Sequence, residues 1–264
     1  MTSNRIKDAA RFLSQARLSG PPTPSLPGDL TPTTIAEGYA LQDAVHAELE
    51  QAGFGARIGH KIGCTTAVMQ AYLSIDHPCA GEVFETTVFK GSTELPLARF
   101  HRIGVECEIA ARLTADLPAR DGGHTRDSVA EAVGALMAGI ELVDDRYVDY
   151  SMLSAPTLIA DDFFNAGVVL GPEVTAWHAL DLETIEGMMV IDDIEVGRGQ
   201  GADILGHPLN ALTWLADHRA ALGTPLRAGD FAMLGSVVKT VHFNAPATVR
   251  IRFDGLGEVA VQFM

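Results

Sequence analysis

Two glutamates separated by one residue are the feature of this sequence that most strongly suggests chemistry. They lie in the segment IGVECEIAARL, residues 103–113, whose apolar runs are typical of a buried strand. Side chains alternate along a strand, so Glu106 and Glu108 would share one face and their apolar neighbours the other. Two carboxylates on one face repel each other, and a hard divalent cation such as Mg²⁺ or Mn²⁺ would neutralise them. Taken alone, the pair fits a solvated strand face at least as well.

A third carboxylate, Glu141, strengthens the metal hypothesis. It lies between Ile140 and Leu142 in an otherwise apolar stretch, where an unpaired charge is costly to bury. Three carboxylates can hold a metal ion from one side and leave positions for substrate and water. The alternative is a structural ion pair with Arg146 or Arg112.

A lysine in an apolar strand is the second candidate for chemistry. Lys61 lies in ARIGHKIGCTT between Ile58 and Ile62 and is followed by a glycine. A cation near a metal-bound anion can hold a carboxylate or carry a proton. A strand lysine that extends its ammonium group to solvent explains the pattern equally well.

The overall charge excludes a binder of the nucleic-acid backbone. The chain of 264 residues has 19 Lys and Arg against 34 Asp and Glu, a formal net charge of −15. The first residues lack the apolar core of a signal peptide, and we find no apolar stretch long enough to span a bilayer. Three cysteines, Cys64, Cys79 and Cys107, suit neither a disulfide framework nor a four-thiolate zinc site. We therefore expect a cytoplasmic protein.

Residues 1–56 are predicted to form an N-terminal helical lobe. Apolar residues repeat at helical spacing over 5–18, and the proline-rich stretch 21–32 ends that helix. A second helix is expected to begin at Thr34, which forms a capping box with Glu37, and to end near Gly53.

Residues 57–264 are predicted to form a β-rich catalytic domain. Helices are expected at 66–73, capped by Thr65, at 128–138, with a capping box of Ser128 and Glu131, and from Pro208 to about 221. Many strands with a few inserted helices indicate an α+β fold with a curved or barrel-like sheet. The expected strands are 58–62, 82–89, 103–112, 139–147, 167–170, 187–196, 231–242 and 247–263, the last folded by a turn at 254–257.

A glycine-rich segment imitates a dinucleotide site. GRGQGA (197–202) follows an apolar run, but the next helix begins only near Pro208, so no helix N-terminus would face a pyrophosphate. The sequence contains no HExxH, GxxxxGK[ST], GxSxG or CxxC motif. Ser236, in LGSVV, can offer its hydroxyl to a ligand, although most such serines are turn residues.

Five segments together resemble the 2-keto-4-pentenoate hydratase family, which also contains the 4-oxalocrotonate decarboxylases and is related to fumarylacetoacetate hydrolase. The resemblance extends in order from about residue 35 to the turn at 255–257. The segments are GHKIGCT (59–65), VECEIA (105–110), AGIELVDDRY (138–147), IADDFFNAGVVLG (159–171) and GRGQGADILGHPLNALTWLA (197–216).

The resemblance implies a fumarylacetoacetase-like, β-rich fold and a Mg²⁺ or Mn²⁺ ion. The metal would be held by Glu106, Glu108 and Glu141, with Lys61 as the catalytic residue. Members are typically homo-oligomers, and a related family enzyme is a further candidate partner.

Two departures from the family pattern bear on the substrate. Cys79 replaces an aspartate of the hydratases, which removes a candidate acid or base, and the segment beginning Ala160-Asp161 is bulkier and carries fewer hydroxyls. We assign substrate binding to Val105, Asp161, Ser236 and Cys79.

The predicted function is metal-dependent addition of water to a 2-hydroxy-2,4-dienoate (a 2-keto-4-enoate), giving a 4-hydroxy-2-keto acid in the meta-cleavage catabolism of aromatic compounds. Decarboxylation of a 2-oxo-3-enedioate through the same dienolate is the alternative, and the loss of the aspartate at position 79 favours it. A carbon–carbon bond hydrolase ranks lower, because we identify no water-activating dyad. A catalytically silent partner subunit would have no need for clustered acids.

Overall fold

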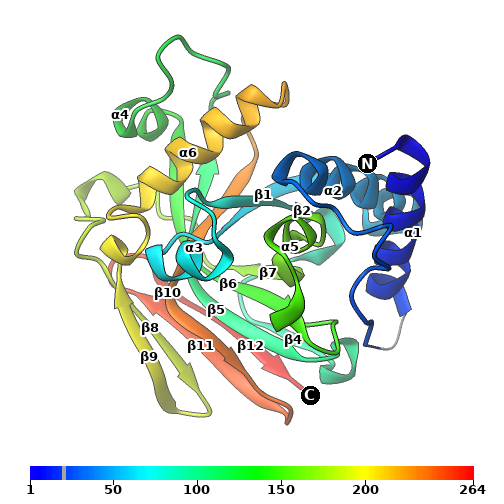
Figure 1. Cartoon of the computed structure of the whole chain (residues 1–264). Coiled ribbons are helices and arrows are strands. Elements are labelled where there is room, and N and C mark those ends of the chain that lie inside the picture. Colours follow the sequence, from blue (N-terminus) through cyan, green and yellow to red (C-terminus); the bar gives the residue numbers. More distant parts are fainter. Residues whose placement is uncertain (20–21) are drawn as a thin grey trace.

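Two β-sheets packed against each other form the centre of the structure, a computed structural model that describes residues 1–19 and 22–264 (Figure 1). The strands are β1 (Arg57–Gly63), β2 (Cys79–Phe84), β3 (Val88–Lys90), β4 (Thr93–Leu95), β5 (Ile103–Leu113), β6 (Val133–Asp144), β7 (Asn165–Leu170), β8 (Glu186–Ile191), β9 (Ile194–Gln200), β10 (Phe231–His242), β11 (Ala247–Phe253) and β12 (Gly257–Phe263).

The larger sheet contains both parallel and antiparallel strand pairs and is curved (Figure 1). Among the described residues its strand order is β2-β1-β10-β5-β6-β7-β3, and that of the smaller sheet is β4-β12-β11-β8-β9. Strand β1 runs parallel to β10 and β3 parallel to β7, while the central β10-β5-β6-β7 pairs are antiparallel. This architecture confirms the predicted α+β class with a curved, barrel-like sheet (Figure 1).

Strands β5 and β6 have two different faces. The face with Val105, Cys107 and Ile109 lies in the main hydrophobic core, which it shares with β11 and β12 of the smaller sheet. The opposite face begins with Glu106 and Glu108 and continues at Ala110 into a separate apolar cluster. The alternation that the sequence predicted for this strand is therefore present.

Helices pack against strands of the larger sheet (Figure 1). Helix α6 packs with Leu209, Leu212 and Leu215 in the main core, as the sequence predicted. Among the described residues, no helix is both long and apolar enough to cross a membrane. The helices are α1 (Ser3–Ser19), α2 (Ile35–Leu49), α3 (Ala67–Leu73), α4 (Arg126–Ala130), α5 (Ala155–Ala160) and α6 (Pro208–Ala221).

Two predicted helices differ in the structure. The helix expected at 128–138 is the short helix α4, and the chain already enters β6 at Val133; its capping box joins Thr125 and Ser128 rather than Ser128 and Glu131. The expectation was wrong because apolar residues of a fully buried central strand run continuously, so they do not distinguish strand from helix. Helix α3 is capped by Thr66, not Thr65.

One predicted strand, 187–196, is a hairpin. Strands β8 and β9 are joined through Asp192 and Asp193, which have φ angles of 47° and 66°. Aspartate tolerates this left-handed conformation better than most residues, and two such residues suit a tight hairpin turn.

The glycine-rich segment 197–202 has a packing role. It forms the end of β9 and the turn after it, and a Cβ atom at Gly199 would lie 2.0 Å from the carbonyl oxygen of Val237. A Cβ atom at Gly201 would lie 1.8 Å from the carbonyl oxygen of Leu182. The glycines therefore allow the backbone of this segment to lie close to the backbone at Val237 and at Leu182.

The N-terminal helices share a core with the rest of the chain. Leu13 of α1 and Leu41 of α2 pack in one cluster with Phe84 of β2 and Leu158 of α5. The division into a lobe of residues 1–56 and a domain of residues 57–264 stays a prediction. Part of the proline-rich stretch 21–32 lies outside the described residues.

A buried ionic network also joins the N-terminal helices to the β-rich part. His46 Nε2 of α2 lies 2.8 Å from Asp162 Oδ2, and its Nδ1 lies 3.4 Å from Glu82 Oε2. Arg17 Nη1 of α1 lies 2.8 Å from the same Asp162 oxygen. Arg57 and Arg219 pair with Glu82. Asp162, His46 and Glu82 are almost entirely buried. Each of these charged side chains is therefore stabilised by its ion-pair partners and not by water.

We expect the stability of the protein to depend on the charge of His46. Burial alone would lower the pKa of His46, but Asp162 and Glu82 raise it from 6.5 to about 9. The folded state thus holds this proton more tightly, and the resulting stabilisation is complete below pH 6.5 and is lost as the pH rises through about 9. Its size is on the order of 3 kcal/mol.

Substitution His46→Gln should remove much of the decline in the free energy of unfolding between pH 6.5 and 9. Urea unfolding of both proteins at a series of pH values measures this difference. Parallel pH profiles for the two proteins would contradict the assignment.

Candidate metal centre

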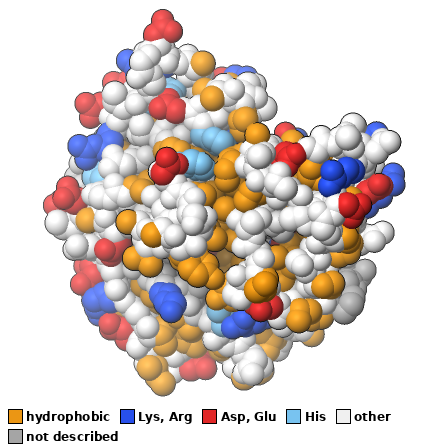
Figure 2. All heavy atoms as spheres, in the orientation of Figure 1, with side chains coloured by type: hydrophobic (Ala, Val, Ile, Leu, Met, Phe, Trp, Pro, Cys, Tyr) orange, Lys and Arg blue, Asp and Glu red, His pale blue; other side chains and the backbone are white. Residues whose placement is uncertain are grey.

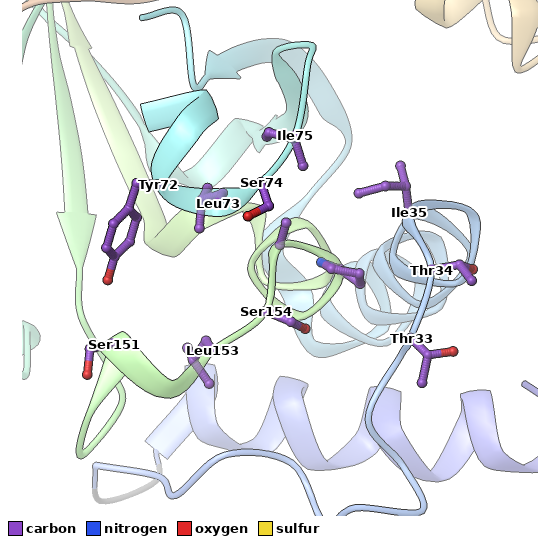
Figure 3. A pocket seen from close by; sticks show the side chains of 12 residues that line it. Thr33, Thr34, Ile35, Tyr72, Leu73, Ser74, Ile75, Ser151, Leu153 and Ser154 are labelled. Atoms are coloured by element: carbon purple, nitrogen blue, oxygen red, sulfur yellow. The ribbon is translucent and has the colours of Figure 1, made fainter. Parts of the chain in front are cut away.

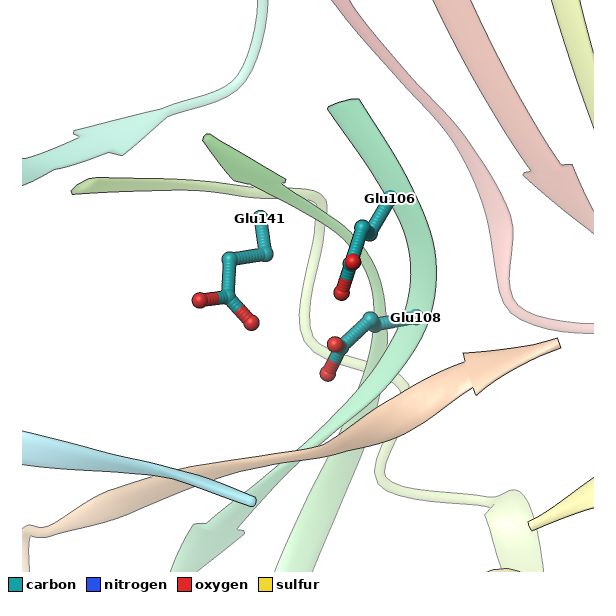
Figure 4. Close-up of side chains that lie close together, drawn as sticks. All are labelled: Glu106, Glu108 and Glu141. Atoms are coloured by element: carbon teal, nitrogen blue, oxygen red, sulfur yellow. The ribbon is translucent and has the colours of Figure 1, made fainter. Parts of the chain in front are cut away.

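Three glutamates converge on one face of the larger sheet (Figure 4). One carboxylate oxygen of each of Glu106, Glu108 and Glu141 lies within 4.8 Å of the others. Glu106 and Glu141 are direct cross-strand partners in the β5–β6 ladder, and Glu108 follows two residues later on the same face. Glu108 and Glu141 are fully buried, and Glu106 is half-buried. The register of two strands therefore assembles the cluster that the sequence predicted as a metal site.

Neighbouring groups orient two of these carboxylates. The backbone N–H of Gly235 in β10 donates a hydrogen bond to Glu108 Oε2 at 2.9 Å, and the Thr240 hydroxyl donates to Glu106. Gly235 has a φ of +114°, and a Cβ atom there would lie 2.4 Å from the Thr65 hydroxyl oxygen. Glycine at this position is required both by the backbone conformation and by the close approach of Thr65.

Lys61 of β1 faces the third carboxylate. Its Nζ lies 3.2 Å from Glu141 Oε1, and the side-chain amide of Asn165 donates to the same oxygen at 2.9 Å. The other oxygen, Glu141 Oε2, is buried and has no hydrogen-bond partner among the described residues. One carboxylate oxygen is thus held by two donors, and the other is left without one.

The electrostatics of the cluster are those of crowded anions. Burial, followed by the charges of Glu141 and Glu106, raises the pKa of Glu108 well above its ordinary value. Burial also raises the pKa of Glu141, and Lys61 opposes this shift. Burial would lower the pKa of Lys61, but the three carboxylates outweigh it and the net shift is upward. Lys61 therefore remains an ammonium group.

These residues fit a divalent cation. One ammonium group cannot balance three carboxylates, and a buried carboxylate oxygen without a partner costs free energy. A hard cation such as Mg²⁺ or Mn²⁺ prefers carboxylate oxygens and would lower the pKa of each carboxyl group that binds it.

A strained turn borders this cluster. Asp162, Phe163 and Phe164 have consecutive φ angles of 50°, 48° and 67°, a left-handed conformation that is costly for residues other than glycine. Each such residue costs on the order of 1–3 kcal/mol, and such strain is frequent at functional sites. The Phe163 ring centroid lies 5.6 Å from Lys61 Nζ, a distance at which a cation and an aromatic face attract each other.

Two thiols, those of Cys64 and Cys79, lie within the electrostatic influence of Lys61. The side chains of Cys64 and Cys79 hydrogen-bond to each other, and this contact raises the pKa of Cys79 and lowers that of Cys64. The positive charge of Lys61 lowers the pKa of both thiols. Position 79 therefore offers a thiol near Lys61 and not the carboxyl group that an aspartate would provide.

Three of the predicted substrate-binding residues make their described side-chain contacts with groups other than the glutamates. Val105 points into the main core, on the opposite face of β5 from the glutamates. The Asp161 carboxylate pairs with Arg146 at 2.8 Å. The Ser236 hydroxyl accepts from Cys107 N and donates to Val238 O, at 2.9 and 2.6 Å. Substrate binding by these three residues stays a prediction.

The arginines considered as alternatives for Glu141 are engaged elsewhere. Arg146 binds Asp161, and Arg112 binds Glu173 at 3.2 Å. Sequence reasoning missed Asn165, Gly235 and Thr240. Ser236 drew attention to the LGSVV segment, but the group that contacts Glu108 is the backbone N–H of the preceding glycine, which has no side-chain signature.

A pocket of about 460 Å³ opens nearby, between α3 and the starts of α2 and α5 (Figure 3). Its described lining is uncharged and does not include the three glutamates. Ile35, Leu73 and Ile75 line it and also belong to the apolar cluster that contains Cys79 and Phe163. Figure 2 shows hydrophobic side chains gathered near the centre of this face of the molecule.

Comparisons with known proteins identify the family of this chain. The family described as fumarylacetoacetate (FAA) hydrolase C-terminal matches residues 80–264. A 2-keto-4-pentenoate hydratase of Burkholderia vietnamiensis (strain G4 / LMG 22486) is 35% identical over 264 residues, covering 98% of each chain. A 4-oxalocrotonate decarboxylase of Pseudomonas sp is 30% identical over 258 residues, covering 97% of each chain.

A solved structure shows the same fold. The 4-oxalocrotonate decarboxylase from Pseudomonas putida G7, complexed with magnesium and adipate, superimposes with a TM-score of 0.92 at 23% identity, covering 100% of this chain and 99% of the other. The matched family covers well over half of the chain, and relatives of 30% identity or more span nearly all of it. The chain therefore belongs to the fumarylacetoacetate hydrolase family, in the group of the 2-keto-4-pentenoate hydratases and 4-oxalocrotonate decarboxylases.

Proposed function

We propose that this protein is a metal-dependent lyase that adds water to a 2-hydroxy-2,4-dienoate and forms a 4-hydroxy-2-keto acid. The observation that carries this proposal is the cluster of Glu106, Glu108 and Glu141 beside the ammonium group of Lys61. The hydratase relative at 35% identity supports the same reaction class. The reaction would belong to the meta-cleavage type of aromatic catabolism.

The three glutamates would hold Mg²⁺ or Mn²⁺. When bound, this ion would supply Lewis-acid stabilisation of negative charge on the carboxylate and the C2 oxygen of the substrate. Gly235 N–H and Thr240 orient two of the carboxylates before any ligand arrives. Such preorganisation keeps the free-energy cost of assembling the site low.

Lys61 would orient the substrate carboxylate and move protons. Its charge is maintained by Glu141, and its buried position keeps it close to the ligand site. In the net reaction, a proton from the 2-hydroxyl moves to C5, and the hydroxyl and proton of water then add at C4 and C3. Lys61 would carry the proton at C5 or C3. The Phe163 face beside Nζ would exclude water from that side.

Decarboxylation of a 2-oxo-3-enedioate is the second candidate reaction. Position 79 carries a thiol, which hydrogen-bonds to Cys64 near Lys61. The carboxyl group that an aspartate would supply there as an acid or base for hydration is therefore missing. The decarboxylase relative at 30% identity supports this alternative. Both reactions require the same three glutamates as metal ligands. They differ in that water adds in the hydration, whereas CO₂ leaves in the decarboxylation.

We also propose the setting in which the enzyme works. It would act in the cytoplasm on a small 2-keto or 2-hydroxy-dienoic acid, as a homo-oligomer, with a related family enzyme as a further candidate partner. Cys79 stays a candidate substrate-binding residue, because its thiol lies in the electrostatic field of Lys61.

The test of the function uses two substrates. We would incubate the purified protein and Mn²⁺ with 2-hydroxypenta-2,4-dienoate and, separately, with 2-oxohex-3-enedioate. Loss of ultraviolet absorbance without CO₂ release indicates hydration, and CO₂ release indicates decarboxylation. Turnover unaffected by EDTA would refute the metal-dependent reaction.

Glu108→Gln should weaken Mn²⁺ binding by more than about 100-fold, because a direct ligand loses its charge, and even the loss of a group that only orients a ligand costs about 10- to 100-fold. The fold should survive, since the substitution also removes repulsion within the cluster. Isothermal titration with Mn²⁺ and urea unfolding measure the two effects. Glu258→Gln, at an exposed position of β12, is the matched control, and equal Mn²⁺ affinity in both variants would refute the ligand assignment.

Lys61→Met should reduce kcat by about 10²- to 10⁴-fold, the usual contribution of a positioned proton-transfer group. Mn²⁺ affinity should be retained or increased, because a competing cation next to Glu141 is removed. Steady-state kinetics and Mn²⁺ titration separate these effects. Lys239→Met changes an exposed lysine of β10 and should leave both values unchanged; a Lys61→Met enzyme with normal kcat would exclude the proposed role.

A further inference from the structure

The strained turn Asp162–Phe164 positions two side chains, those of Phe163 and Asn165, at the candidate metal centre. Phe163, within the turn, places its ring centroid 5.6 Å from Lys61 Nζ. Asn165, directly after the turn, donates its side-chain amide to Glu141 Oε1 at 2.9 Å. The conformation of the turn therefore decides whether both groups reach the site.

A guanidinium group of the N-terminal helix α1 spans this turn. Arg17 Nη1 donates to Asp162 Oδ2 at 2.8 Å, and Arg17 Nη2 donates to the carbonyl oxygen of Asn165 at 2.6 Å. The two nitrogens of one rigid fork thus contact the first residue of the turn and the residue that follows it. The Arg17 side chain is 5% exposed, so solvent competes little for these hydrogen bonds.

The other partners of the turn support this arrangement. His46 Nε2 contacts both oxygens of Asp162, and the backbone N–H of Glu82 donates to Asp162 Oδ1. Arg146 donates to the carbonyl oxygen of Phe164 at 3.4 Å. Of these groups, Arg17 is the one that contacts both the turn and the backbone of Asn165.

The effect on Glu141 follows from hydrogen-bond geometry. Asn165 and Lys61 both donate to Oε1, which leaves Oε2 as the buried oxygen without a partner among the described residues. Without the Asn165 amide, the carboxylate can rotate and present its oxygens differently to a cation. Outer groups of this kind orient the ligands of many metal centres.

We propose that Arg17 is a positioning residue for the metal centre: it holds the left-handed turn Asp162–Phe164 closed, and thereby holds Asn165 on Glu141. This inference rests on the proposed function for the identity of the metal ligands. It gives the N-terminal helix, which contributes no ligand, a direct influence on cation affinity. Residues 17 and 162 are 145 positions apart in the sequence.

The test compares Arg17→Gln and Arg17→Lys with the unchanged protein. Lysine keeps the charge but cannot make two parallel hydrogen bonds, so it should not restore the geometry. Both variants should bind Mn²⁺ about 10- to 100-fold more weakly, the range typical for the loss of a group that orients a metal ligand. Asn165→Ala should reproduce this loss, because it removes the last group in the chain of contacts.

A second measurement requires no metal. Hydrogen–deuterium exchange of the metal-free protein should rise in a peptide spanning 160–166 in both Arg17 variants. Arg112→Gln is the matched control. Arg112 lies in β5, the strand that carries Glu106 and Glu108, and its substitution breaks an ion pair with Glu173 and a hydrogen bond to the carbonyl oxygen of Gly229. It should change neither Mn²⁺ affinity nor exchange at 160–166.

The outcomes distinguish this inference from the proposed function. An unchanged protein that binds no Mn²⁺ would remove the metal-dependent function, while exchange would still report whether Arg17 closes the turn. Normal Mn²⁺ affinity in a folded Arg17→Gln or Arg17→Lys variant would overturn the positioning role, and so would unchanged exchange. If Arg17→Gln does not fold, the Arg17→Lys variant decides the question, and normal Mn²⁺ affinity in Asn165→Ala would also overturn the positioning role.

Discussion

The mutual repulsion of three carboxylates inside the protein is the constraint on which this site depends. Glu108 and Glu141 are fully buried and Glu106 is half-buried, in a position where water cannot fully screen their charges. Lys61 balances part of the charge, and a divalent cation would balance the rest. Such a cluster is unfavourable as a purely structural element. Its presence at the centre of the sheet therefore indicates ligand binding.

The fold prevents the carboxylates from relieving this repulsion by moving apart. The strands that carry them, β5 and β6, pair along their whole length and press their other face onto the smaller sheet. A close-packed core of this kind resists small displacements. The apolar side chains that alternate with the glutamates therefore do more than stabilise the fold, because they keep the ligand oxygens near one another.

The N-terminal helices complete the site from outside the sheet. A charged network of Arg17, His46, Glu82 and Asp162 joins them to the left-handed turn beside Lys61. Removing one partner of a buried ion pair is strongly destabilising, because it leaves an uncompensated charge, so such pairs penalise any arrangement that breaks them. They suit a role in which one conformation of a strained turn must be selected over less strained ones.

The sequence by itself determined the local alternation of side chains. It placed Glu106 and Glu108 on one face of a strand, it identified Lys61 and Glu141 as polar residues in apolar strands, and its motifs indicated the family and the α+β fold. Strand β6 was partly mistaken for a helix, since continuous apolar runs lack a period.

Only the tertiary structure decided which residues meet. The pairing of Glu106 with Glu141 depends on strand register, the contact of Glu108 with Gly235 on a backbone N–H, and the contact of Arg17 with Asn165 on chain segments 148 residues apart. None of these leaves a local pattern, because hydrogen bonds between distant segments depend on how the whole chain packs rather than on residue spacing.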